Sequence, residues 1–139
     1  MLKSARTLLC LLAALPLAAD GTAMLKDAIT YYYGNGAVAL IKEANSGKFH
    51  ISPAGYLIVL DETGKTLIHG ESSRLIGVNM TNLKDARGRL YIKEALDARA
   101  KGKGKVHFFM PQGSSQVKAT LQWEFQEGVL FGWVMAGEL

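Results

Sequence analysis

Apolar and polar side chains alternate strictly over residues 117–126, near the end of the chain. A period of two is typical of a β-strand with one buried face and one exposed face. We therefore expect Trp123 to lie in the core and Gln122 to lie on the opposite, polar face. The apolar positions are Val117, Ala119, Leu121, Trp123 and Phe125, and the polar positions are Lys118, Thr120, Gln122, Glu124 and Gln126.

Two apolar runs predict a hairpin earlier in the chain. Residues 56–60 form the first run, and residues 66–69 form the second. The sequence Asp61-Glu62-Thr63-Gly64 lies between them. Asp accepts backbone hydrogen bonds in turns and Gly adopts positive φ, so this segment predicts the turn. Because apolar residues stand at successive positions, both faces of the hairpin should be covered.

Helical spacing of apolar residues appears in two regions. Residues 24–46 show it, interrupted by Gly34-Asn35-Gly36, so we expect one kinked helix or two helical pieces. A second helix is predicted to begin at Asp85-Ala86-Arg87-Gly88, with Asp85 as its cap. It should end at the Lys- and Gly-rich segment 101–105.

The order of the predicted elements defines the fold class. Residues 106–110, which stop at Pro111, and residues 129–135 are apolar runs that predict two more strands. The order is then helix, two strands, helix, three strands. Short links between most strands favour an antiparallel sheet. The prediction is a single α+β domain, with about five strands, an N-terminal helical arm and a helix across the sheet.

The first 23 residues have the pattern of a secretory signal peptide. Lys3 and Arg6 precede an apolar run over residues 7–19, and small residues follow, so cleavage is expected after Ala19 or Ala23. The run is short of the roughly 20 residues that a membrane-spanning helix needs. The prediction is a signal peptide over 1–23 and an exported, periplasmic domain over 24–139. An uncleaved membrane anchor is the alternative.

Charge and cysteine content exclude two classes of function. The chain has 16 Lys and Arg against 12 Asp and Glu, and losing Lys3 and Arg6 with the leader leaves a surplus of two. Such a small surplus gives little counterion release, which argues against nucleic-acid binding. Cys10 is the only cysteine and lies in the predicted leader. The mature domain is therefore expected to have neither disulfides nor thiolate chemistry.

No pattern in the sequence indicates catalysis or a cofactor. The three histidines, His50, His69 and His107, do not stand at metal-ligand spacing on one element. Ser72-Ser73 lacks the glycines of a nucleophile elbow, and the glycines of 101–105 fit no phosphate-binding loop. We expect no enzyme activity, no metal and no cofactor.

Four stretches between Tyr56 and Lys118 form an ordered series of motifs: GYLIVLDETGKTLIHG, LIGVNMTNLKDARGRLYIKEAL, GKGKVHFFMP and VKATL. This series is similar to the single Cache domain of bacterial extracytoplasmic sensors. The matching positions are Asp61, Gly64, His69, Gly70, Leu75, Gly77, Asp85, Gly88, Tyr91, Glu94, Gly104, Pro111 and Lys118. The chain departs from the family pattern at Lys105, where a Trp is usual, and at Leu121, where a Tyr is usual. The residues at two further aromatic positions of the family are Phe108 and Met110 here.

This resemblance implies a PAS-like fold and a function. A domain of this kind recognises a small molecule, such as an organic acid, without catalysis. We expect the chain to signal through a membrane receptor or another partner, because no membrane helix follows its last strand. The lost aromatic hydroxyls imply a less polar ligand. They also favour the alternative, an accessory subunit of an exported complex with a degenerate pocket.

The resemblance also indicates the candidate ligand site. Lys118 is the expected counter-charge for an anionic ligand, and His69 is the expected hydrogen-bonding partner. Each has a plainer explanation: Lys118 as a solvated lysine on the polar face of its strand, and His69 as a ring hydrogen-bonded at the sheet rim. The expected pocket walls are Tyr56, Tyr91, Phe108 and Met110.

Overall fold

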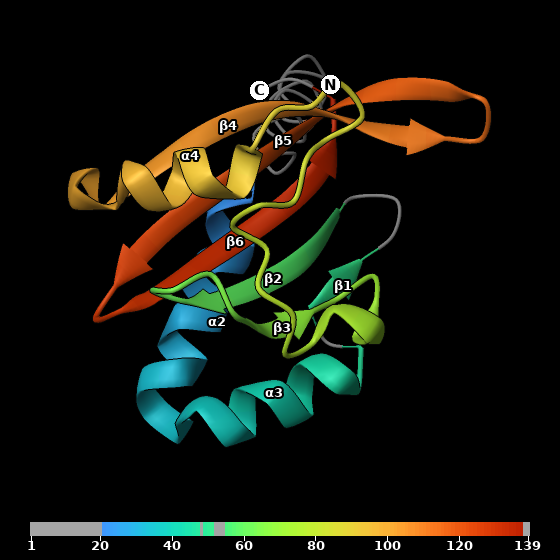
Figure 1. Cartoon of the computed structure of the whole chain (residues 1–139). Helices are drawn as coiled ribbons and strands as arrows, with labels where there is room; N and C mark the ends of the chain where they lie inside the picture. Colours follow the sequence, from blue (N-terminus) through green and yellow to red (C-terminus); the bar gives the residue numbers. More distant parts are fainter. Residues whose placement is uncertain (1–20, 48, 52–54, 138–139) are drawn as a thin grey trace, which may run out of the picture.

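A six-stranded antiparallel sheet organises the domain (Figure 1). The computed structural model describes residues 21–47, 49–51 and 55–137. The sheet order is β1-β2-β6-β5-β4, and β3 also pairs with β2. The strands are β1 (His50–Ile51), β2 (Gly55–Asp61), β3 (Thr66–His69), β4 (Lys103–Gln112), β5 (Ser115–Gln126) and β6 (Val129–Ala136). The helices are α2 (Thr22–Asn35), α3 (Ala37–Asn45) and α4 (Tyr91–Asp97), with short 3₁₀ turns η2 (Ser73–Leu75) and η3 (Arg99–Lys101).

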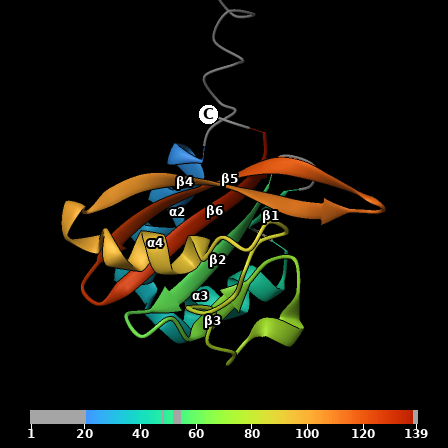
Figure 2. The ribbon, with the colours of Figure 1, turned by 45° about the horizontal axis from the view of Figure 1, so that its top comes forward.

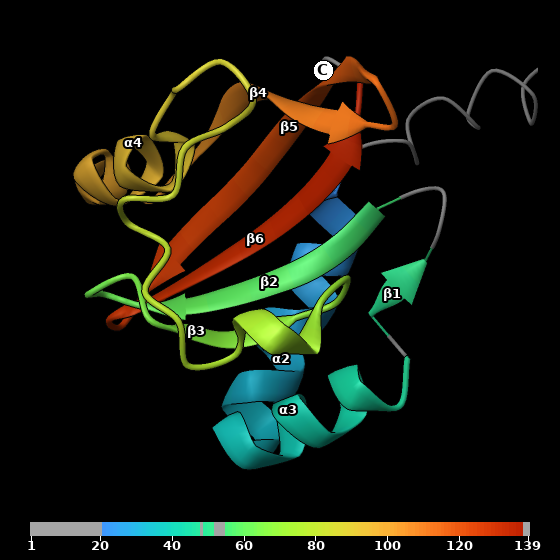
Figure 3. The same cartoon turned by 45° about the vertical axis from the view of Figure 1, so that its right-hand side comes forward.

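Helices cover both faces of this sheet, and each face has its own core. Figures 2 and 3 show α4 and the segment that follows β3 on one side, with α2 on the other. On the α4 side, Leu121 and Trp123 of β5 pack with residues of α4. On the α2 side, Phe131 and Trp133 of β6 pack with residues of α2 and α3. The strand β6 is therefore buried on both faces, as its continuous apolar run predicts.

The N-terminal arm is broken where the glycines predict a break. Gly36 separates α2 from α3 and has φ +88°, a conformation that glycine adopts without steric cost. The helical arm and the predicted hairpin turn are both confirmed. Asp61 Oδ1 accepts the backbone N–H groups of Thr63 and Lys65, at 2.9 and 3.0 Å.

The predicted start of the second helix is wrong. Helix α4 begins at Tyr91 and has no side-chain cap, so Asp85 lies in the preceding loop. Asp85 Oδ1 accepts the backbone N–H groups of Arg87 and Arg89, at 2.9 and 2.7 Å. Asp85 Oδ2 accepts the N–H of Phe109 in β4, at 2.9 Å. The carboxylate therefore fastens this loop to the free edge of β4.

These hydrogen bonds also keep Asp85 ionised. Burial acts to raise the pKa of the carboxyl group, but the three backbone donors and the charge of Arg89 outweigh it, so the pKa lies below its ordinary value. The same edge of β4 receives the backbone N–H of Ala86 at the carbonyl of Phe109, 2.9 Å away. Covering an edge strand in this way removes a template for pairing with another chain.

Water does not cover all of the polar face of β5. Gln122 Oε1 accepts the backbone N–H of Gly21, at 2.8 Å, and Gln122 Nε2 donates to Thr22 Oγ1, at 2.9 Å. Thr120 is fully buried and donates to the carbonyl of Gly137, at 2.7 Å. The alternation itself is confirmed, since Trp123 is only 2% exposed. Gln122 is half-buried on the opposite face, because the start of α2 crosses it.

The predicted leader lies almost wholly outside the described residues, which begin at Gly21. Lys3, Arg6, Cys10 and Ala19 are among the residues outside. None of the helices within the described part of the chain is both long and apolar enough to cross a membrane.

Candidate functional site

A groove of about 450 Å³ opens on the α4 side of the sheet. Two antiparallel cross-strand pairs build its walls, because paired residues share a face. Tyr56 of β2 pairs with Val134 of β6, and Met110 of β4 pairs with Val117 of β5. The full set of lining residues is Gly55, Tyr56, Glu71, Met110, Pro111, Gln112, Val117, Val134, Met135 and Ala136.

His69 lies behind Tyr56. Its partner across the β2–β3 pair is Ile58, which stands two residues after Tyr56 on the same face of β2. The ring centroids of His69 and Tyr56 are 5.1 Å apart, and the two rings are tilted by 37°. The backbone N–H of Ser72 donates to Nδ1 of His69 over 2.9 Å, so the neutral ring carries its proton on Nε2.

The environment keeps this imidazole neutral. Burial lowers the pKa of His69 below its ordinary value, and the opposing charge of Glu71 only reduces that shift. A neutral ring at pH 7 packs against Tyr56 without adding positive charge to the site. His69 does not itself line the groove; its ring packs against Tyr56, which does.

Tyr91 and Phe108 form the deeper part of the same face. Tyr91 opens α4 and stacks on Phe108 of β4, with parallel rings and centroids 4.0 Å apart. Both side chains are buried, at 9% and 4% exposure. This stack fixes the start of α4 against the sheet beside the groove.

The two tyrosine hydroxyls are held in their neutral form. Burial raises the pKa of Tyr91 to about 12, and the charge of Asp85 adds to the shift. The pKa of Tyr56 is raised further, by burial first and then by Tyr91 and Glu71. Within the described residues, neither hydroxyl makes a hydrogen bond. Neither hydroxyl oxygen is fully buried, so neither is a buried polar atom without a partner. Of the two tyrosines, only Tyr56 lines the groove.

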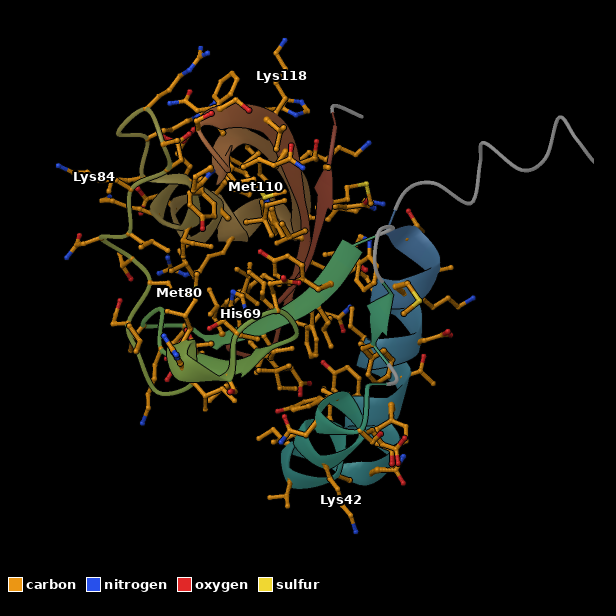
Figure 4. The ribbon with its side chains drawn as sticks, turned by 90° about the vertical axis from the view of Figure 1, so that its right-hand side faces the viewer. Lys42, His69, Met80, Lys84, Met110 and Lys118 are labelled. Carbon is orange, nitrogen blue, oxygen red and sulfur yellow. The ribbon has the colours of Figure 1, made fainter. Side chains whose placement is uncertain are left out.

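Lys118 lies outside this groove. It follows Val117 on β5, so alternation directs its side chain to the opposite face, beside Phe109. The side chain is exposed. Figure 4 shows it pointing outward, away from His69 and Met110. An anion held by Lys118 would need a site on that other face. The structure thus brings Tyr56, His69, Tyr91, Phe108 and Met110 to one face and leaves Lys118 on the other.

Glu71 is the charged residue among the lining residues that the sequence analysis missed. It stands two residues after His69, between β3 and η2, where the chain has no regular period. Its position directly after His69-Gly70 is the feature of the sequence that could have indicated a place beside the site. Among the described lining residues, Glu71 alone carries a charge.

A second hollow of about 370 Å³ lies near the start of α2. Its lining residues are Thr22, Lys103, Gly104, Lys105, Gln122, Trp123 and Glu124. It contains none of the six candidate residues. The described part of the chain holds no cluster of three His, Cys, Asp or Glu side chains placed to bind a metal.

Comparisons with known proteins agree with this geometry. The sequence model of the family described as single Cache domain 2 matches residues 26–136. A solved structure concerned with carboxylic acid recognition by a Cache chemosensory domain is 20% identical, with a TM-score of 0.67, covering 83% of this chain and 87% of that one. The periplasmic sensor domain of a chemotaxis protein is also 20% identical, with a TM-score of 0.62, covering 91% and 92%.

A third structure, a methyl-accepting chemotaxis protein from Vibrio parahaemolyticus RIMD 2210633, is 20% identical with a TM-score of 0.59, covering 89% of this chain and 84% of that one. A search of curated proteins finds no match. At these identities the structures establish the fold. The predicted α+β, PAS-like architecture is confirmed.

Proposed function

Because the chain belongs to the single Cache domain 2 family, we propose that it is an extracytoplasmic sensor domain that binds a small molecule and has no catalytic activity. The ligand site is the groove between Tyr56 and Met110. A membrane-bound partner would carry the signal onward.

The groove is the observation that carries this proposal. Its volume of about 450 Å³ falls within the range of roughly 300–1,000 Å³ that is usual for small-molecule sites. Apolar walls from Met110, Val117 and Val134 combine with a few polar side chains, those of Tyr56, Glu71 and Gln112. Such a combination gives affinity through the walls and orientation through the polar groups.

A thermal-shift screen tests the function. The purified chain would be heated with acetate, succinate, alanine or 1,4-diaminobutane, and we expect one class to raise the melting temperature by several degrees. A ligand at 100 times its dissociation constant stabilises the folded state by about 2.7 kcal/mol. The variant Val117→Trp fills the groove from its rim and should abolish the shift while the ligand-free protein still melts cooperatively.

Lys118→Met is the matched control, since it alters the neighbouring residue on the opposite face of β5. Unchanged affinity in this variant supports the groove. A ten-fold loss, about 1.4 kcal/mol, would instead support the anion anchor expected from the resemblance. If no compound shifts the melting temperature, the accessory-subunit function becomes the better explanation.

We also propose export to the periplasm, with cleavage after Ala19. Gly21 is buried against Trp133, where a Cβ at position 21 would lie 2.5 Å from the indole Cδ1. Gln122 binds Gly21 and Thr22. Cleavage after Ala23 would remove these contacts, whereas cleavage after Ala19 keeps them.

Intact mass measurement of the protein recovered from the periplasm tests this cleavage site. We expect a mature N-terminus at Asp20. An N-terminus at Met24 would show that the first turn of α2 is dispensable. Full-length protein confined to the cytosol would contradict export.

A further inference from the structure

We propose that the polar face of β4 and β5 binds anionic phospholipids at a membrane surface. Its exposed cations are Lys103 and Lys105 of β4 and Arg87 of the loop before α4, and we call the surface that carries them the basic face. The basic face lies on the opposite side of the sheet from the ligand groove. The inference therefore goes beyond the proposed function and does not depend on it.

Strand pairing brings the side chains of the basic face together, because directly opposed residues share one face of a sheet. The cross-strand pairs on this face are Lys103–Glu124, Lys105–Gln122, His107–Thr120 and Phe109–Lys118. Arg87 reaches the same face from its loop, and its guanidinium carbon lies 3.7 Å from the centroid of the Phe109 ring. From Lys103 to Phe109 the row spans roughly 20 Å at the rise of a strand. The cations therefore extend beyond the hollow of about 370 Å³ at the Lys103 end.

The helices leave the basic face open. Among the described residues, the core on the α2 side contains side chains of α2, α3, β2, β3 and β6 and none of β4 or β5. The start of α2 meets the polar face of β5 at Gln122. Lys103, Lys105 and Arg87 are all exposed. An extended and charged sheet face is therefore accessible to a partner.

The net charge of the basic face is positive. Within the described part of the chain, Lys103, Lys105 and Arg87 form no ion pair with a carboxylate. Glu124 is the one carboxylate that the described residues of β4 and β5 place on this face. Lys118 shares the face, but it makes an interaction within the chain and its charge is not counted. The surplus of two cations equals that of the whole mature domain, so the positive charge of the domain is concentrated here.

Asp85 does not neutralise Arg87, although it stands two residues away. Its carboxylate accepts the backbone N–H groups of Arg87, Arg89 and Phe109, and the cation that helps to lower its pKa is Arg89. The side chain of Arg87 instead donates from Nε to Gln116 Oε1, at 3.0 Å, and packs on Phe109. The charge of Arg87 therefore remains available at the surface.

The position of the predicted leader identifies the partner as a membrane surface. Gly21 donates its backbone N–H to Gln122 on this side of the sheet, at 2.8 Å, and Asp20 alone separates Gly21 from the apolar run over residues 7–19. Whenever that run lies in a bilayer, during export or as an anchor, the basic face is close to the lipid headgroups. Each Lys or Arg near an anionic surface strengthens binding about five-fold. Anionic phospholipids therefore match the basic face in both charge and location.

Co-sedimentation with vesicles tests the inference. The vesicles contain phosphatidylcholine alone or with one-third phosphatidylglycerol, and the protein is the form that cells produce, mature or full-length. We expect tighter binding to the anionic vesicles, by about ten-fold or more, and a loss of this preference at high salt, which screens exposed charges. The double variant Lys103→Gln/Lys105→Gln should bind the anionic vesicles about ten-fold or more weakly than the wild type. Any leader contributes equally to both proteins.

Lys65→Gln/Lys84→Gln is the matched control, because it changes the net charge equally at two exposed lysines outside the basic face. It should weaken binding by less than about two-fold, since charges distant from the surface are screened. Arg87 provides a second comparison. Arg87→Gln should weaken binding about five-fold, whereas Arg87→Lys keeps the charge and should bind as the wild type does.

The exchanged side chains are exposed, so the melting temperatures of the variants should match that of the wild type. If the double variant fails to fold, the single variant Lys105→Gln replaces it, with an expected loss of about five-fold. Equal binding to neutral and anionic vesicles, or equal losses in the two double variants, would overturn the inference. A poly-glutamate peptide serves as the competing probe. If it binds the wild type but not Lys103→Gln/Lys105→Gln, while anionic vesicles bind neither protein, the face takes an acidic peptide and the lipid assignment is wrong.

Discussion

Replacing Trp123 with Ala is expected to lower the free energy of unfolding by about 3–5 kcal/mol. The indole is 2% exposed and belongs to the core between the sheet and α4. It also lies over Gly104 of the adjacent strand, where a Cβ would come within 2.8 Å of the ring. Backbone on one side and packed side chains on the other leave little room for collapse, so truncation should leave a cavity.

Chemical denaturation of the two variants Trp123→Ala and Gln122→Ala measures the difference between the faces of β5. Gln122→Ala removes the hydrogen bonds to Gly21 and Thr22 but leaves no cavity in the core. We expect it to cost about 2 kcal/mol or less, since each of the two bonds contributes about 1 kcal/mol net. Equal and large losses at both positions would contradict the assignment of the two faces.

The alternation on β5 could be predicted from sequence because it depends on residues next to one another. What crosses the polar face could not, since Gln122 and the start of α2 are about a hundred positions apart. The same reason explains the error at Asp85. An Asp that caps a helix and an Asp that accepts N–H groups in a loop use the same local chemistry. The partner that decides between them here, Phe109, is 24 residues away.

The candidate site shows the same division. Tyr56, Phe108 and Met110 stand at positions whose alternation places them on the α4 face. The family pattern includes Lys118, but the alternation of β5 places its side chain on the other face of the sheet from that of Val117. Which face of β5 borders a groove depends on the packing of β2, β4 and β6, so sequence alone could not decide it. Glu71 lies in an irregular segment, where no period exists to assign a face.

Replacing Gly64 with Ala is expected to destabilise the fold more than the same change at Gly88. Both glycines have positive φ, +96° and +85°, and placing an L-residue in that region costs about 1–2 kcal/mol. The space around them differs. A Cβ at Gly88 meets nothing within 4 Å, whereas a Cβ at Gly64 would overlap Thr81 Oγ1.

The overlap matters because Thr81 holds the segment after η2 to the β2–β3 turn. Its hydroxyl donates to the carbonyl of Thr63, at 3.0 Å, beside the donation from Asn79 to the same carbonyl, at 2.9 Å. Displacing Thr81 should lose about 1 kcal/mol more, the typical net contribution of one such bond. We therefore expect a total loss of about 2–3 kcal/mol for Gly64→Ala and about 1–2 kcal/mol for Gly88→Ala.

A double-mutant cycle separates the two causes. Thr81→Ala removes the hydroxyl that the new methyl group would meet, so Gly64→Ala should cost less in that background than in the wild type. The backbone cost at positive φ remains in both backgrounds and cancels in the cycle. Denaturation midpoints of the four proteins give the coupling energy. Additive losses in the free energy of unfolding, or equal losses at Gly64 and Gly88, would contradict this explanation. They would show that the turn accommodates the new methyl group without displacing Thr81, and that positive φ alone requires the glycine.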